Sequence, residues 1–242
     1  NYTQSELISI ESLMGAGREF LRHHPGLLKH RAAECSPDDI AAMFYTSGTT
    51  GNPKGVIHSH RNLISVSRAA SAMEGLSSAE EVLAYLPMAW IGDFAMTVGA
   101  GIGLHFTINI PESAETVLHN LREIAPTYYL AAPRSWDNLL TLVQVRMEDS
   151  TPFKKAVYRF FMDRAVSHER LKLEGLAVPW WSGLMRALGE WLVFGPIKDQ
   201  LGLSCLKHPF TGGEAIGEDT FIFYRALGVK LRQLYGQTET CA

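Results

Sequence analysis

Cysteine and long apolar runs are both scarce in this sequence, and each shortage excludes a class of protein. The 242 residues contain three cysteines, Cys35, Cys205 and Cys241, and no two of them are spaced as CxxC. An odd number of widely spaced cysteines indicates free thiols in a reducing compartment, and argues against a disulfide framework or a zinc site. No uninterrupted apolar run reaches the roughly 18 residues of a membrane span, so we expect no transmembrane helix.

A surplus of positive charge is missing as well. The chain has 22 Lys and Arg against 25 Asp and Glu, a net charge of −3, which argues against a general nucleic-acid binder. The first residues, NYTQSELISIES, lack the basic start and apolar core of a signal peptide, and no initiator methionine is present. We therefore expect a cytoplasmic protein and a chain that begins inside a longer polypeptide. An apolar content of 46% with 19% charged residues is typical of globular domains and not of disorder.

The most informative feature that is present is a polar loop at residues 45–55, YTSGTTGNPKG. It follows a compact apolar run at residues 40–45, which predicts a strand. Glycines let backbone N–H groups approach an anion closely, hydroxyl groups add donors, and a lysine adds a mobile positive charge. The residues that supply these groups are Thr46, Ser47, Gly48, Thr49, Thr50, Gly51 and Lys54. The loop therefore predicts a polyphosphate site, with a plain flexible turn as the alternative.

Two commoner nucleotide motifs do not fit. The Walker pattern needs a glycine directly before the lysine, and here Pro53 stands before Lys54. The dinucleotide pattern GxGxxG needs a different glycine spacing and should follow a strand. Residues 99–103, GAGIG, fail that spacing and precede a predicted strand, so these glycines indicate close packing.

Three stretches resemble one known superfamily. YTSGTTGNPKGV resembles the phosphate-binding loop of adenylate-forming enzymes, which comprise acyl-CoA synthetases, peptide-synthetase adenylation domains and luciferases. Residues 234–240, LYGQTET, are similar to the YGxTE motif of the same superfamily. Residues 126–140, PTYYLAAPRSWDNLL, resemble a stretch of long-chain acyl-CoA synthetases. The motifs occur in the family's order, and the resemblance covers residues 40–242.

The resemblance implies an α/β fold, with a mostly parallel sheet covered by helices, that forms part of the large N-terminal AMP-binding domain. Strands that alternate with helices favour the same architecture independently. We divide the chain into a lead-in (1–39), a phosphate-loop region (40–149), a helical stretch (150–200) and an adenine- and magnesium-binding segment (201–242). The ribose-binding aspartate, the small C-terminal domain and its adenylation lysine would come later, so we expect an inactive fragment of a ligase.

The resemblance also implies a set of substrates and site residues. The substrates are ATP, a fatty acid and coenzyme A, and the metal is Mg²⁺. The loop with Lys54 would hold the β- and γ-phosphates, Thr238 would donate to the α-phosphate, and Glu239 would hold Mg²⁺. Around the adenine, Tyr235 would stack on one side, next to Gly236, and the residues lining the other side are Gly212, Gly213 and Glu214.

One residue departs from the family's pattern. Trp90 stands where the segment LP(L/M)xH has a histidine beside the acyl pocket. We predict that Trp90 forms a wall of that pocket, and a plain core residue is the alternative. Asp93, three residues later, is expected to be a solvated loop acid.

The sequence leaves other functions open. The acid could be aryl, short-chain or an amino acid, and the chain could be a non-catalytic nucleotide-binding or membrane-surface module. Amphipathic helices are predicted at residues 154–165 and 182–194, the second ending at Gly195-Pro196, with Trp180 and Trp181 between them. A basic amphipathic helix near tryptophans could contact a membrane peripherally, but we expect packing onto the sheet.

The remaining patterns predict elements and two histidine groups. We expect His23, His24 and His30 on the surface, and a structural role for the pair His58 and His60. A helix capped by Ser59 should bury Leu63, Val66, Ala70 and Met73. Further strands are predicted at 82–87, 104–110, 125–130 and 229–234, and further helices at 113–124 and 218–227, the last ending at Gly228.

Overall fold

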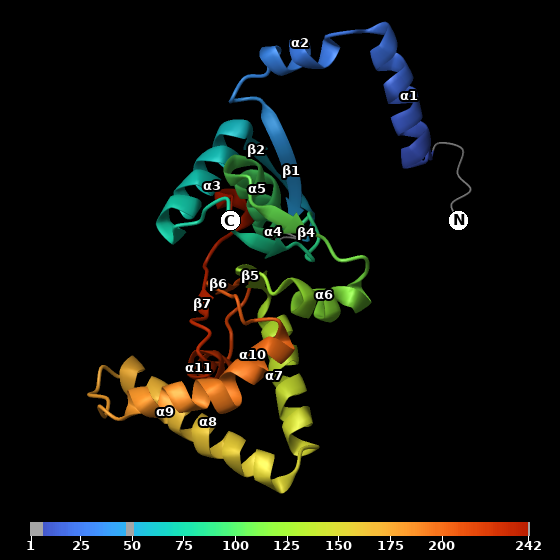
Figure 1. Cartoon of the computed structure of the whole chain (residues 1–242). Helices are drawn as coiled ribbons and strands as arrows, with labels where there is room; N and C mark the ends of the chain where they lie inside the picture. The colour runs from blue at the N-terminus through green and yellow to red at the C-terminus, as the bar shows by residue number, and fades with distance from the viewer. Residues whose placement is uncertain (1–6, 47–50, 242) are drawn as a thin grey trace.

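The computed structural model describes residues 7–46 and 51–241, and a five-stranded sheet lies at its centre (Figure 1). Its strands are β3 (Glu81–Leu83), β4 (Thr107–Asn109), β5 (Tyr128–Ala131), β6 (His208–Thr211) and β7 (Arg232–Gln233). They are arranged in the order β4-β3-β5-β6-β7, and every neighbouring pair is parallel. The predicted α/β fold with a mostly parallel sheet is therefore confirmed.

A separate hairpin carries the ends of the phosphate loop. Strands β1 (Ile40–Thr46) and β2 (Lys54–Ser59) pair antiparallel, with Thr46 opposite Lys54. The strand predicted at residues 40–45 is thus confirmed. The predicted loop connects the two strands, and its residues Ser47, Gly48, Thr49 and Thr50 lie outside the described residues.

One face of the parallel sheet is covered by the larger helical group. This group contains α6 (Val117–Ile124), α7 (Pro133–Glu148), α8 (Pro152–Leu173), α10 (Gly195–Leu201) and α11 (Glu218–Leu227). Tyr129 and Ala131 of β5 point into the core on this side, where Trp136 is fully buried. Tyr128 and Leu130 belong to the other face, because successive side chains of a strand alternate. Trp136 Nε1 also donates to the Phe210 carbonyl oxygen at 3.2 Å and fixes α7 to β6.

The opposite face is covered by α3 (His60–Glu74), α4 (Ile91–Phe94), the π-helical turn η1 (Ala95–Ala100) and α5 (Gly101–Leu104). The Ser59 side chain caps α3 by accepting from the Asn62 N–H at 3.2 Å, as predicted. The predicted buried face is partly wrong. α3 buries Leu63, Ser67 and Ser71, whereas Ala70 is exposed and Met73 is 82% exposed. The reason is that η1 packs on the side of α3 that carries Ser67, whose hydroxyl donates to the Ala95 carbonyl.

The second predicted amphipathic helix does not end where proline suggested. α9 (Ser182–Gly189) continues through the π-helical turn η3 (Glu190–Phe194) directly into α10. Pro196 lies in the first turn of α10, where its missing N–H is tolerated beside a π-turn. A side chain at Gly195 would lie 2.7 Å from the Glu190 carbonyl oxygen, so the glycine allows this tight winding. The Gly195-Pro196 stop is therefore a wrong prediction.

The first two helices, α1 (Ile10–His23) and α2 (Leu27–Glu34), reach away from the rest of the molecule and bury no residue (Figure 1). His23, His24 and His30 are exposed on them, as predicted, and bond to Glu19, to the Phe20 carbonyl and to Glu34.

Within the described parts of the chain, no helix is long and apolar enough to cross a membrane.

The other predicted elements exist with different lengths. The strands predicted at 82–87, 104–110, 125–130 and 229–234 are only two to four residues long. The helix predicted at 113–124 begins as the 3₁₀ turn η2 (Ala114–Thr116), capped by Ser113. The helix predicted at 154–165 lies within the longer α8. Helix α11 and its stop at Gly228, with φ of 98°, match the prediction.

Candidate functional site

A cavity of about 320 Å³ opens at the carboxyl ends of β5, β6 and β7. Its walls come from α3, from residues 90–100 and from the two segments that follow β6 and β7. Ligands of parallel α/β sheets bind at this edge, because the loops that leave the strands converge there. The size is within the usual range for small-molecule sites, roughly 300–1,000 Å³.

Residues from three separate sequence motifs meet at this cavity. The predicted site residues that line it are Trp90, Gly212, Gly213, Tyr235, Gly236 and Thr238. Thr46, Gly51, Lys54, Glu214 and Glu239 lie outside its lining, and the last four are exposed. The cavity therefore joins most of the predicted adenine contacts to the predicted α-phosphate donor, while Lys54, Glu214 and Glu239 lie on the open surface.

Three contacts hold the segment after β7 in place. The Leu234 N–H donates to the Thr211 carbonyl at 2.8 Å, which continues the pairing of β7 with β6. His58 Nε2 donates to the Thr238 carbonyl at 2.7 Å. Farther along, Cys241 is buried against Phe44 and neighbouring apolar residues. Because His58 belongs to β2, the strand that leaves the phosphate loop is bonded directly to the YGQTE segment.

His58 is therefore a structural residue, as predicted. Its side chain is buried, whereas His60 is exposed at the first position of α3. In residues 7–46 and 51–241, no three His, Cys, Asp or Glu side chains gather as a metal cluster.

Trp90 and Gly213 lie next to each other in the lining of the cavity. Trp90 is the N-cap residue of α4 and is partly buried. Gly213 has a φ of 92°, a conformation that favours glycine, and a Cβ atom there would lie 3.9 Å from Trp90 Cζ2. The indole of Trp90 thus forms a wall of the cavity beside a stretch of bare backbone.

Asp93 is not the solvated acid that the sequence suggested. It lies in the first turn of α4 with only 7% of its surface exposed. Burial raises the pKa of its carboxyl group to about 6, because the charged form loses hydration. The prediction failed because α3 and η1 pack around a segment that reads as a loop.

The donor set around the cavity suits a magnesium-bound nucleotide. Lys54 and Glu239 form no ion pair with any residue that the structure describes, so both charges are free to meet a ligand. Mg²⁺ is commonly held by one or two carboxylates together with substrate phosphates, so a single Glu239 is sufficient. The Tyr235 ring is 92% exposed beside the cavity and can stack on a planar base.

Sequence reasoning missed part of the lining. Ser67, Ala70 and Ser71 of α3 form a small-residue wall, and Met96 and Tyr128 complete that side. The signal was available in α3, where small residues recur at helical spacing next to the larger Leu63 and Val66. The pattern at residues 125–130 predicts a strand for Tyr128 but does not show which face of the sheet its side chain occupies.

Comparison with known proteins gives one family. The family model described as AMP-binding enzyme matches residues 4–242. The long-chain-fatty-acid–CoA ligase ACSBG2 of Rattus norvegicus is 26% identical over 222 residues, which is 88% of this chain and 32% of that protein. The chain spans about a third of the length of the curated relatives that it matches.

Solved structures give the same fold. The o-succinylbenzoate coenzyme A synthetase of Bacillus subtilis in complex with AMP matches 86% of this chain and 32% of that chain, with 19% identity and a TM-score of 0.55. The N-terminal domain of FACL13 from Mycobacterium tuberculosis matches 86% of this chain and 39% of that chain, with 21% identity and a TM-score of 0.53. The fold of the chain is therefore that of adenylate-forming enzyme domains.

Proposed function

The chain belongs to the family of AMP-binding enzymes, and from this we propose that it supplies the nucleotide-binding part of an ATP-dependent acyl-CoA ligase for long-chain fatty acids. In that enzyme it forms part of the large N-terminal domain. The observation that carries the proposal is the single cavity where Trp90, Gly212, Gly213 and the Tyr235–Thr238 segment meet. His58 bonds this cavity to the strand that leaves the phosphate loop.

The proposed reaction has two steps. A carboxylate oxygen attacks the α-phosphorus of ATP, and the bond to the bridging oxygen of pyrophosphate breaks. The thiol of coenzyme A then attacks the acyl carbon, and AMP leaves. Because the first step joins two anions, it needs positive potential and exact positioning more than proton transfer.

The chain's own residues supply those two needs. Lys54 would neutralise the outer phosphates and the leaving pyrophosphate, and the Thr238 hydroxyl would donate to the α-phosphate. Glu239 would hold Mg²⁺, which supplies charge neutralisation when bound. Tyr235 would cover one face of the adenine while the backbone at Gly212 and Gly213 lies against the other, since a side chain there would occupy the space of the base.

The choice of a long-chain fatty acid has two supports. ACSBG2 carries that activity in its name and is similar over most of this chain. The cavity wall opposite the nucleotide segment is largely apolar, with Ile91, Met96 and Leu130 on it. An apolar wall suits an acyl chain.

The test is acid-dependent exchange of pyrophosphate into ATP. It is measured on the 242-residue chain and on the longest polypeptide that its reading frame encodes, with long-chain, short-chain, aryl and amino acids. We expect exchange by the longer polypeptide with long-chain acids, and no acyl-CoA formation by the 242-residue chain. In the longer polypeptide, Lys54→Ala and Glu239→Ala should each lower the exchange rate by about 100-fold or more.

Matched substitutions of exposed residues outside the cavity serve as controls. Lys29→Ala on α2 and Glu174→Gln after α8 should leave the exchange rate within twofold. An exchange rate that neither site substitution lowers would contradict the roles proposed for Lys54 and Glu239. Exchange with only aryl, short-chain or amino acids would support the proposed adenylation but contradict the proposed long-chain substrate. Nucleotide binding without any exchange would indicate a non-catalytic module.

A further inference from the structure

The cavity at the carboxyl ends of β5, β6 and β7 shares one wall with a second cavity. The second cavity has a volume of about 440 Å³ and lies between α3, η1 and α5. Ser67, Ser71 and Ala100 line both cavities. This shared wall can therefore contact a ligand on either side.

The two serines of the shared wall differ in their bonding. Ser67 Oγ donates to the Ala95 carbonyl oxygen at 3.2 Å, and a Cβ atom at Gly99 would lie 2.2 Å from it, so this hydroxyl is fixed against η1. Ser71 is only 3% exposed, and among the residues that the structure describes nothing bonds to its hydroxyl. A serine inside a helix usually bonds to the carbonyl four residues earlier or points to solvent, and Ser71 does neither.

A buried hydroxyl without a partner lowers the stability of a protein, because it has lost its bonds to water. Alanine at position 71 would occupy nearly the same space without that loss. The serine side chain turns about a single torsion with three staggered positions, so its hydroxyl can reach a ligand without movement of the backbone. The unpaired hydroxyl of Ser71 therefore indicates a bond to a ligand.

A second hydroxyl lies on the same side of the first cavity. Tyr128 is 3% exposed, and the centres of its ring and the Phe210 ring are 5.4 Å apart. Burial raises the pKa of its phenol, and the negative charge of Glu74 raises this pKa further, so the group stays protonated. Ser71 and Tyr128 thus add two neutral hydrogen-bonding groups to a wall that also carries Met96.

The nearby charges decide which kind of ligand group fits this wall. Glu74 lies one turn after Ser71 on α3 and already pairs with Arg232. Asp93 is a second buried acid whose charge acts on Tyr128. The described lining of the cavity contains no Lys or Arg, so an anionic group would meet two acids without a free cation. A neutral oxygen group, such as a hydroxyl or a ketone, meets no such repulsion.

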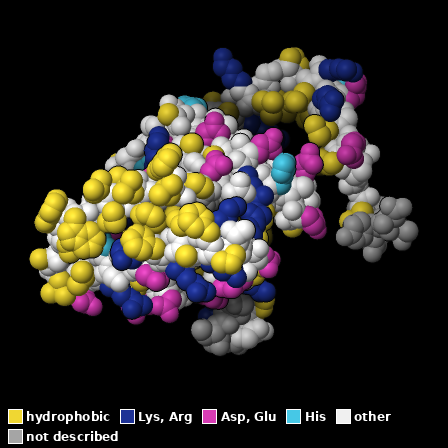
Figure 2. Space-filling view, turned by 60° about the horizontal axis from the view of Figure 1, so that its bottom comes forward, with side chains coloured by type: hydrophobic (Ala, Val, Ile, Leu, Met, Phe, Trp, Pro, Cys, Tyr) yellow, Lys and Arg dark blue, Asp and Glu magenta, His cyan; other side chains and the backbone are white. Residues whose placement is uncertain are grey.

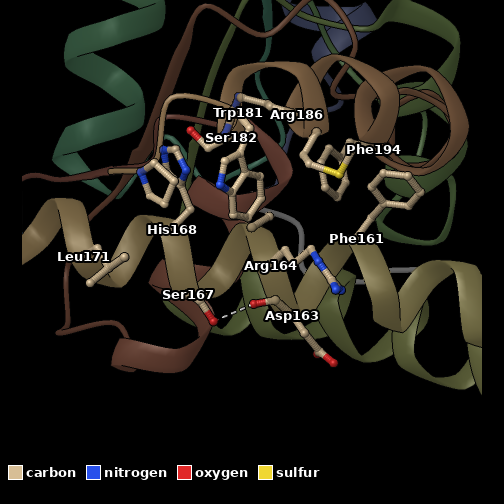
Figure 3. A pocket seen from close by; sticks show the side chains of 13 residues that line it. Phe161, Asp163, Arg164, Ser167, His168, Leu171, Trp181, Ser182, Arg186 and Phe194 are labelled. Atoms are coloured by element: carbon tan, nitrogen blue, oxygen red, sulfur yellow. Dashed lines mark hydrogen bonds between the residues drawn. The ribbon is translucent and has the colours of Figure 1, made fainter. Parts of the chain in front are cut away.

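The groove between α8 and α9 gives a contrast (Figure 3). Its volume is about 240 Å³. Ser167 Oγ donates to the Asp163 carbonyl oxygen at 2.8 Å, and Arg186 pairs with Glu169 at 3.6 Å. These polar groups are satisfied within the protein, so they do not indicate a ligand as Ser71 does.

The helical end of the molecule is a surface and not a cavity. Figure 2 shows a broad hydrophobic area there, and Trp180 and Trp191 are 93% and 77% exposed. The packing expected of the amphipathic helix at residues 182–194 is found on its inner side, where Val193 and Phe194 enter the core. Exposed apolar side chains form no directional bond, so they do not select one acid over another.

We propose that Ser71 is a specificity-determining residue, and that the cavity prefers carboxylic acids whose acyl chain carries a hydroxyl or ketone oxygen bonded to Ser71 and Tyr128. This inference rests on the proposed ligase function, because it assigns part of the cavity to the acyl chain. The carboxylate would lie toward Thr238 and the oxygen group toward α3. An unsubstituted chain leaves the Ser71 hydroxyl unpaired, which is the physical basis of the preference.

The test compares hexadecanoic acid with hexadecanoic acids that carry one hydroxyl or one oxo group at successive positions of the chain. Acid-dependent pyrophosphate exchange is measured on the longest polypeptide that the reading frame encodes. We expect kcat/KM for the best oxygenated acid to exceed that for hexadecanoic acid by about tenfold or more. Calorimetric binding of the same acids to the 242-residue chain gives a second readout that needs no ligase activity.

Ser71→Ala should reduce this preference to about twofold or less, whereas Ser71→Thr keeps a hydroxyl and should retain most of it. Tyr128→Phe should lower the preference in part. The matched control is Ser67→Ala, which should keep the preference because the Ser67 hydroxyl is already bonded to η1. Urea unfolding checks the fold: Ser71→Ala should be at least as stable as the unaltered chain, and Ser67→Ala less stable.

The outcomes separate this inference from the ligase proposal. Binding that prefers an oxygenated acid and depends on Ser71, without exchange by any acid, would contradict the ligase and support the Ser71 site. Exchange in which no oxygenated acid is preferred would overturn the inference and leave the ligase. A preference that persists in Ser71→Ala, or that Ser67→Ala abolishes equally, would also overturn it. Neither exchange with nor binding of any acid would overturn both.

Discussion

At the scale of single residues, the burial of Asp93 predicts that the free energy of unfolding depends on pH. Its pKa is raised from 3.8 to about 6 because burial disfavours the charged form. The native state therefore binds this proton more tightly than the unfolded state, so the stabilising contribution is complete below about pH 4 and is lost as pH rises through 6. Asp93→Asn should raise the free energy of unfolding by about 1 to 3 kcal/mol at pH 7.5 and leave it nearly unchanged at pH 4.

Urea unfolding of the two proteins at pH 4, 5.5 and 7.5 measures this difference directly. Asp163→Asn on α8 is the control, because Asp163 is exposed and should show no such trend. A constant difference between Asp93→Asn and the unaltered chain across this range would contradict the raised pKa.

Residues such as Trp90 and Asp93 show what a sequence can and cannot tell about a site. The motif around Trp90 predicted a wall of the acyl pocket. The structure places Trp90 in the lining of the cavity, and its contact with an acyl chain stays a prediction. The burial of Asp93 depends on where α3 and η1 pack, and no local pattern records that packing. For the same reason, the role of His58 was predicted as structural, but its partner, the Thr238 carbonyl, could not be predicted.

At the scale of elements, the end of α10 depends on one glycine. Gly202 has a φ of 73° and follows the last turn of α10, where it packs against α6. A Cβ atom there would lie 2.1 Å from the Leu121 carbonyl oxygen, which is far inside contact distance. Gly202→Ala should therefore lower the free energy of unfolding by about 2 to 4 kcal/mol, as overpacking adds to backbone strain.

Gly183→Ala in α9 is the matched control for this substitution. No atom lies within 4 Å of a Cβ at that position, so alanine should stabilise the helix by up to about 1 kcal/mol. Both changes are measured by urea denaturation. A Gly202→Ala variant as stable as the unaltered chain would mean that α6 and α10 are not packed this closely.

The elements were predictable to the extent that their signals are local. Helix α11 matched its prediction because a periodic pattern, acidic first-turn residues and Gly228 all agree. The strands were predicted too long, since apolar residues continue past the last ladder hydrogen bond into the loops that form the cavity. The predicted helix end at Gly195-Pro196 is wrong because a π-helical turn accommodates a proline without ending the helix. The position of that turn depends on its packing against the core.

At the scale of the whole molecule, two polar contacts connect residues that are far apart in the chain. His58 of β2 donates to the Thr238 carbonyl, and Arg232 of β7 pairs with Glu74 of α3. Together they join the loop-bearing hairpin and α3 to the sheet. The spatial relation between the phosphate loop and the adenine segment therefore rests on contacts that no single motif contains.

Removing the first of these contacts should loosen the cavity without unfolding the sheet. In His58→Phe the Thr238 carbonyl loses its donor, which costs about 1 to 3 kcal/mol when a buried group is left unpaired. We expect amide hydrogen exchange in residues 234–241 to quicken by about tenfold, while exchange in β5 and β6 stays unchanged. His58→Gln keeps a donor and should restore part of the protection, whereas His119→Phe, an exposed change on α6, should have no effect. Equal exchange in the His58→Phe variant and the unaltered chain would show that the hairpin and the C-terminal segment are held together by the apolar cluster around Cys241 instead.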